Sequence, residues 1–147
     1  MSMRNRLLSL ALFILAFICI AICVFWPISF SKELFEEDYL AVTYVDSMDD
    51  SEEPVKDFNF DSNSPEFKQL KQIFKEYSYH KCLDTWKNNP SIEFGEEPFI
   101  ISNGSDKIII STAPSIVIND KVYRVGYLGT SKIKDLHSEL KKMLNLE

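Results

Sequence analysis

The fold class follows from a stretch near the C-terminus, residues 98–125, which reads PFIISNGSDKIIISTAPSIVINDKVYRV. Runs of β-branched and aromatic residues alternate there with turn residues, a pattern typical of short strands joined by tight connections. Asn119 and Asp120 predict a two-residue hairpin, because both residue types tolerate the positive φ that such a turn demands. The strands predicted from this stretch are residues 98–102, 107–112, 115–118 and 121–125.

Two further strands are expected upstream of this stretch. Residues 39–45 (YLAVTYV) combine β-branched and aromatic side chains, and residues 55–60 form a shorter candidate. Between them, residues 46–54 (DSMDDSEEP) predict a solvated loop.

Two amphipathic helices are predicted on either side of the C-terminal strands. Ser64 can cap the first helix and Pro65 suits its first position, with apolar residues at helical spacing over about 15 residues. The second helix is expected over residues 131–144. Together these elements predict an α+β domain in which two amphipathic helices pack on an antiparallel sheet of about four or five strands.

The N-terminal part of the chain predicts one transmembrane helix. The stretch 7–26 begins at Leu7, ends at Trp26 and contains no charged residue. At a helical rise of about 1.5 Å per residue, its length matches a hydrocarbon core of roughly 30 Å. A surface helix of a globular domain would carry a polar face, which this stretch lacks.

The flanking charges predict the orientation of this helix. Arg4 and Arg6 precede it, whereas acidic residues dominate after it, so the positive-inside rule keeps the N-terminus in the cytoplasm. The predicted organisation is a cytoplasmic tail (1–6), the membrane helix (7–26), a juxtamembrane linker (27–38) and an extracytoplasmic domain (39–147). Trp26 suits the membrane interface.

Two alternatives for the N-terminal segment remain open. A cleaved signal peptide would use the small residues near 29–31, although 20 apolar residues exceed the roughly 7–15 of a signal-peptide core. A lipid-modified Cys19 or Cys23 is the other, although large isoleucines precede both cysteines where a lipoprotein signal needs a small residue.

The anchor, the amphipathic helix, the hairpin sequence IVINDKVYRV (116–125) and the closing helix together resemble a family of small single-pass extracytoplasmic proteins. Those proteins come from low-GC Gram-positive bacteria and have no known function. The resemblance implies the topology described above and implies no activity.

Charge and cysteine content restrict the partners. All 22 acidic residues but only 14 of the 16 basic residues follow the membrane stretch, which leaves a net charge of −8. Such a domain repels phosphate backbones, so we expect no nucleic-acid binding and favour a basic protein partner. Cys82 is the one cysteine outside the membrane stretch and therefore cannot form an intramolecular disulfide.

The nearest approach to a metal signature is the alternation of Asp57, Asn59, Asp61 and Asn63. Oxygen ligands at alternate positions resemble the start of an EF-hand loop. The sixth position, which needs glycine, and the twelfth, which needs glutamate, are occupied here by serine and lysine. An alternating strand edge explains the same pattern, and we predict no metal site or cofactor. A domain that senses divalent cations through residues 46–63 remains an alternative, which calorimetry with calcium would test.

His80, Cys82 and Asp84 suggest a second alternative, a small thiol hydrolase. No family signature or glycine-rich oxyanion turn surrounds this cysteine. If the preceding helix continued this far, His80 and Asp84 would share one of its faces. His137 lies between core positions of the last helix and is expected at the boundary between core and surface.

These observations predict a non-enzymatic protein. The leading hypothesis is a membrane-tethered interaction module of the inhibitor, immunity or accessory-subunit type, with a partner in the cell envelope.

Overall fold

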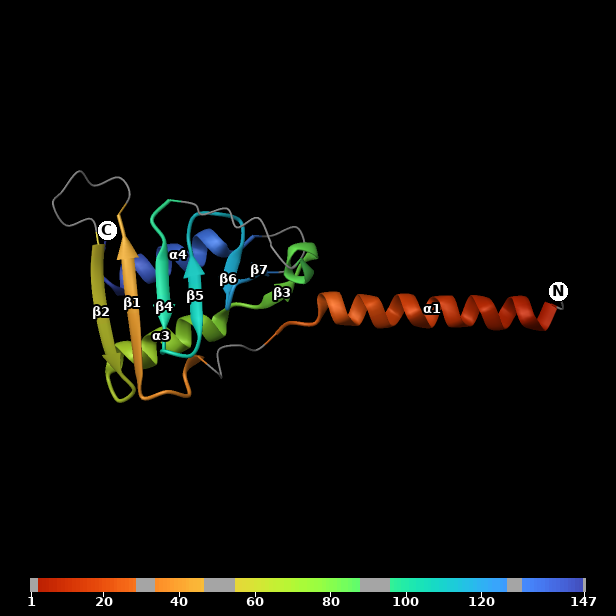
Figure 1. Cartoon of the computed structure of the whole chain (residues 1–147), viewed down its shortest axis with the longest axis horizontal. Coiled ribbons are helices and arrows are strands. Elements are labelled where there is room, and N and C mark those ends of the chain that lie inside the picture. The colour runs from red at the N-terminus through yellow and green to blue at the C-terminus, as the bar shows by residue number, and fades with distance from the viewer. Residues whose placement is uncertain (1–2, 29–33, 47–54, 88–95, 127–130, 147) are drawn as a thin grey trace.

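The computed structural model describes most of the chain (Figure 1). The described residues are 3–28, 34–46, 55–87, 96–126 and 131–146.

The N-terminal helix α1 (Met3–Phe25) projects away from the rest of the chain (Figure 1). Its span Asn5–Cys23 covers 19 residues, is long and apolar enough to cross a membrane, and is 0% buried within the fold. Arg4 and Arg6 lie in the first turns of α1. Leu7 and Trp26, the two ends of the predicted membrane stretch, are 60% and 68% exposed. The prediction of an N-terminal apolar helix is confirmed, and a signal sequence has the same properties.

In the described residues a seven-stranded sheet forms the centre of the domain, with the strand order β2-β1-β4-β5-β6-β7-β3. Every neighbouring pair is antiparallel. The strands are β1 (Tyr39–Val45), β2 (Val55–Asp61), β3 (Tyr79–Lys81), β4 (Phe99–Ser102), β5 (Lys107–Ile110), β6 (Ile116–Ile118) and β7 (Lys121–Val125). The α+β class and the antiparallel sheet are confirmed.

The expected strand number of four or five is wrong, since the sheet has seven. All six candidate segments join one sheet, and β3 adds an edge strand shortly after the first helix, where no strand was predicted. That helix ends because Tyr77 adopts extended backbone (φ −106°, ψ 147°), after which Tyr79 pairs with Val125.

Helices α3 (Pro65–Glu76) and α4 (Ile133–Met143) cover one face of the sheet (Figure 1). The Ser64 side chain caps α3 by accepting the backbone N–H of Phe67 at 3.1 Å. The hairpin between β6 and β7 turns at Asn119 and Asp120, whose φ values are 46° and 62°.

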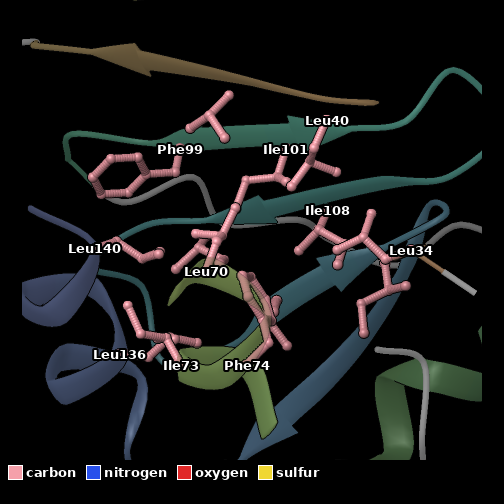
Figure 2. Close-up of a cluster of buried hydrophobic side chains, with 14 of the residues drawn as sticks. Leu34, Leu40, Leu70, Ile73, Phe74, Phe99, Ile101, Ile108, Leu136 and Leu140 are labelled. Atoms are coloured by element: carbon pink, nitrogen blue, oxygen red, sulfur yellow. The ribbon is translucent and has the colours of Figure 1, made fainter. Parts of the chain in front are cut away.

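The hydrophobic core lies between these helices and the sheet. Figure 2 shows Leu70 and Phe74 of α3 beside Leu136 and Leu140 of α4, facing side chains such as Ile101 of β4. All five side chains are fully buried.

The chain just before β1 also contributes to the core. Leu34 and Phe35, which lie in the predicted juxtamembrane linker, are 1% and 5% exposed. The Phe35 ring meets the rings of Phe67 and Phe74 edge-on at 5.4 and 5.8 Å between centroids. Burial of these two apolar side chains fixes the approach to β1 against α3.

The opposite face of the sheet carries one continuous cross-strand row. Its members are directly paired from β2 to β7, in the order Asp57, Thr43, Ile100, Ile109, Val117 and Val122. The row is therefore polar at the β2 end and aliphatic over the rest of the sheet.

The end of α1 is joined to the sheet at β3. The backbone N–H of Ile28 donates to the carbonyl of Tyr79 at 2.8 Å, in an isolated antiparallel bridge. After β3 the chain forms a short 3₁₀ helix, η1 (Leu83–Trp86), which contacts β7. Helix α1 thus leads into one edge of the sheet, and β2 forms the opposite edge.

Candidate functional site

The strand β2 is the edge of the sheet most distant from α1 (Figure 1). Within the described residues it pairs with β1 alone, so the other side of this seven-residue strand has no strand partner. An open edge presents backbone donors and acceptors that another chain can join as an added strand.

The two faces of β2 differ in chemistry. Phe58 and Phe60 are half-buried on the helix-covered face, with their rings stacked at 6.3 Å between centroids. Asp57, Asn59 and Asp61 are exposed on the other face. We call β2 with these three polar residues the acidic edge. Its charges discourage pairing between identical edges, because like charges would oppose each other.

The four residues whose alternation resembles the start of an EF-hand loop belong to this edge and the turn that follows it. Asp57 accepts a hydrogen bond from the Thr43 hydroxyl at 2.6 Å. Asp61 accepts bonds from the backbone and side-chain nitrogens of Asn63 at 2.9 and 3.2 Å. In the part of the chain that the structure describes, no three His, Cys, Asp or Glu side chains gather closely enough to hold a metal ion.

A second polar group lies where β1, the start of β4 and α4 meet. Glu97 accepts a hydrogen bond from the Tyr44 hydroxyl at 3.1 Å and forms an ion pair with Lys141 at 2.9 Å. Nε2 of His137 lies 2.8 Å from the Glu97 carbonyl oxygen and therefore donates to it. We call Tyr44, Glu97, His137 and Lys141 the α4 clasp.

The electrostatics of the α4 clasp follow from these contacts. The Lys141 ammonium holds the pKa of Glu97 below its usual value, and Glu97 in turn raises the pKa of Lys141. Burial, and then the bond to Glu97, raises the pKa of Tyr44. At neutral pH the cluster is an ion pair with a neutral tyrosine, an arrangement that attaches α4 to the sheet.

Sequence reasoning missed the α4 clasp. Glu97 has a positive φ of 50°, an uncommon conformation for glutamate that its three partners maintain. These partners lie 53, 44 and 40 residues away along the chain, so no local pattern signals the cluster.

The third group surrounds Cys82, which precedes η1. The Thr85 hydroxyl accepts the Cys82 backbone N–H at 2.8 Å and donates to the Val122 carbonyl. The Cys82 thiol lies 3.6 Å from both the Thr85 hydroxyl and the Val122 carbonyl. These contacts attach η1 to β7.

The other residues of the hydrolase hypothesis lie on different elements. His80 is buried on β3, opposite Arg124 of β7, and Asp84 lies on η1 in an ion pair with Lys87. The shared helical face that would have brought His80 and Asp84 together does not form, because α3 ends at Glu76.

No family model, curated protein or solved structure matches this chain.

Proposed function

We propose that this protein is a non-enzymatic interaction module, anchored in a membrane by α1, that binds another envelope protein through the acidic edge. The observation that carries the proposal is the open side of β2 in the described fold, a strand of seven residues that includes the exposed Asp57 and Asp61. Backbone pairing with an extended segment supplies affinity, and the side chains of the edge select the partner's charge.

The chemistry of the partner follows from the charge of the edge and of the whole domain. A basic extended segment is attracted by Asp57 and Asp61, whereas a second copy of the acidic edge is repelled. The net charge of −8 on the chain after the anchor adds long-range attraction for a cationic protein. This arrangement suits an inhibitor, immunity or accessory subunit.

The anchored state is supported by the bridge between Ile28 and Tyr79. Cleavage near residues 29–31 would remove Ile28 from the edge of β3. An uncleaved anchor keeps this contact, and Arg4 and Arg6 then direct the domain to the extracytoplasmic side.

The orientation is tested by labelling intact cells with a membrane-impermeant maleimide. The variant has Cys19, Cys23 and Cys82 changed to serine and carries Lys75→Cys, at an exposed position of α3. We expect labelling without permeabilisation. Labelling only after permeabilisation would show that the domain lies on the cytoplasmic side, opposite to the proposed orientation.

The interaction surface is tested by site-specific photocrosslinking on intact cells. A benzophenone side chain at Asn59, exposed on β2, should capture a discrete partner, whereas the same group at exposed Lys134 on α4 should not. Equal capture at both positions, or none at Asn59, would contradict binding through the acidic edge.

Charge neutralisation then tests the recognition chemistry. Asp57→Asn and Asp61→Asn each keep an acceptor oxygen for Thr43 and Asn63 while removing the charge. Both substitutions should weaken capture and reduce its dependence on salt, because exposed charge pairs are screened by ions. The matched control is Glu76→Gln, which neutralises an exposed acid at the C-terminal end of α3. It should change neither the capture of the partner nor the salt dependence of that capture.

A further inference from the structure

The largest exposed apolar side chains of the domain include two on η1. Leu83 is 83% exposed, the highest value among the large hydrophobic residues described, and Trp86 is 52% exposed. Large apolar side chains exposed close together are the kind of surface that binds a partner or a membrane, so this pair is a candidate contact.

Leu83 and Trp86 project from one side of η1. In a 3₁₀ helix there are about 3.0 residues per turn, so side chains three positions apart eclipse one another. Thr85, which is buried and bonded to the Val122 carbonyl, holds the other side of η1 against β7. The apolar pair therefore faces outward on a turn that is fixed to the sheet.

The strand directions bring this turn back to the end of α1. The chain leaves α1 at Phe25 and continues through Ile28 into the domain. Because the bridge between Ile28 and Tyr79 is antiparallel, β3 runs in the opposite direction, toward the end of the anchor. Leu83 follows four residues after Tyr79, and Figure 1 shows the green turn of η1 beside the end of α1.

The residues around this position have the chemistry of a membrane interface. Trp26, 68% exposed at the end of α1, and Trp86 suit the headgroup layer, where tryptophan is enriched. Lys81 and Lys87 flank η1, and Lys87 forms an ion pair with Asp84 on η1, so Lys81 is the lysine at this level that can approach lipid phosphates.

We propose that η1 is a second membrane contact, in which Leu83 and Trp86 enter the interfacial layer of the same bilayer that α1 crosses. This inference rests on the proposed anchoring by α1. The two contacts together fix the tilt of the domain on the membrane surface.

The test uses the full chain reconstituted in phosphatidylcholine vesicles, with or without bromine on the upper acyl carbons. Trp26→Phe leaves Trp86 as the single tryptophan, and Trp86→Phe leaves Trp26. We expect Trp86 to show blue-shifted emission and a loss of intensity in brominated lipid comparable to that of Trp26. Adding Leu83→Ser should reduce the quenching of Trp86, because it removes the apolar neighbour that enters the layer with it.

A tryptophan on the opposite edge provides the control. Val55→Trp, combined with Trp26→Phe and Trp86→Phe, places the reporter on β2 at a residue that is 46% exposed. It should stay unquenched by brominated lipid and accessible to aqueous iodide, and quenching there would overturn the proposal.

The two single-tryptophan variants separate the possible failures. If Trp26 is quenched and Trp86 is not, the anchor stands and the contact through η1 is wrong. If neither is quenched, α1 is not in the bilayer, and both the anchoring and the second contact are refuted.

Discussion

Ile28 and Tyr79 join the N-terminal helix to the sheet through one backbone hydrogen bond of 2.8 Å. Tyr79 is itself held firmly, since its buried hydroxyl donates to the Phe74 carbonyl at 3.0 Å. Two residues separate Phe25, the end of α1, from Ile28, so α1 and the domain share a short junction that includes this hydrogen bond.

Substitution of Ile28 by proline tests this junction. Ile28→Pro removes the donor and should lower the free energy of unfolding by about 1 kcal/mol more than Ile28→Ala, which keeps the N–H. Urea denaturation in non-ionic detergent measures both variants. Equal losses would show that the bond contributes nothing to stability.

The Glu97–Lys141 pair predicts a pH dependence. Because the pKa of Glu97 is lower in the folded state, its contribution is fully present above the unfolded-state pKa. That contribution is lost as the pH falls through the folded-state pKa. The wild-type chain should therefore lose more stability on acidification than Glu97→Gln does, as measured by urea denaturation at neutral and acidic pH. An equal loss of stability on acidification in the wild-type chain and in Glu97→Gln would contradict this pH dependence.

Direct coupling within the same pair is measured by a double-mutant cycle. Both side chains are only about a fifth exposed (22% and 21%), so we expect Glu97→Gln and Lys141→Met to be non-additive by roughly 0.5–2 kcal/mol. The matched control is Lys132 with Asp135, a pair more than half exposed, whose coupling should be below about 0.5 kcal/mol.

The Thr85 hydroxyl should be essential for the attachment of η1. Thr85→Val keeps the shape of the side chain but leaves the Cys82 N–H and the Val122 carbonyl without this partner. A cost of about 1–3 kcal/mol is expected from burying unpaired polar groups, whereas Thr85→Ser should cost less. Thermal unfolding distinguishes them, and equal melting temperatures would refute this role.

The capping of α3 by Ser64 gives a local prediction. Ser64→Ala removes the acceptor for the Phe67 N–H and should cost about 1 kcal/mol, while Ser64→Asp should retain most of the stability. Chemical denaturation measures both variants. An alanine variant as stable as the aspartate variant would show that the cap is dispensable.

Gly104 provides a test of backbone strain. Its φ is +92°, and an added Cβ would lie 2.5 Å from the Tyr39 hydroxyl. Gly104→Ala should destabilise the domain by about 1 kcal/mol or more, and should still do so when Tyr39→Phe removes that hydroxyl, since the positive φ remains. Full rescue by Tyr39→Phe would assign the cost to the contact alone.

The elements predicted well are those specified by neighbouring residues. The start of α3 was predictable because Ser64 and Pro65 act within one turn, and the last hairpin because Asn119 and Asp120 accept positive φ. The three residues of β3 carry no such local pattern. Their extended state depends on pairing with β7, which lies more than 40 residues away.

The candidate sites also combine features visible in the local sequence with features that depend on the tertiary fold. The alternation from Asp57 to Asp61 was visible in the sequence, but its position on an open edge depends on the order of the whole sheet. The α4 clasp joins residues from three distant segments, and Glu97 acquires its role only when α4 packs beside it. Tertiary packing, which no local pattern contains, brings such groups together.

The position of α1 at one edge of the sheet and of the acidic edge at the other makes the sheet a rigid spacer. Adjacent strands lie about 4.8 Å apart, so the six intervals from β3 to β2 separate the two edges by roughly 29 Å. Hydrogen bonds between every neighbouring pair keep this separation constant. If the proposed anchoring by α1 and the proposed pairing at β2 both hold, this separation sets the distance between the membrane helix and the bound segment.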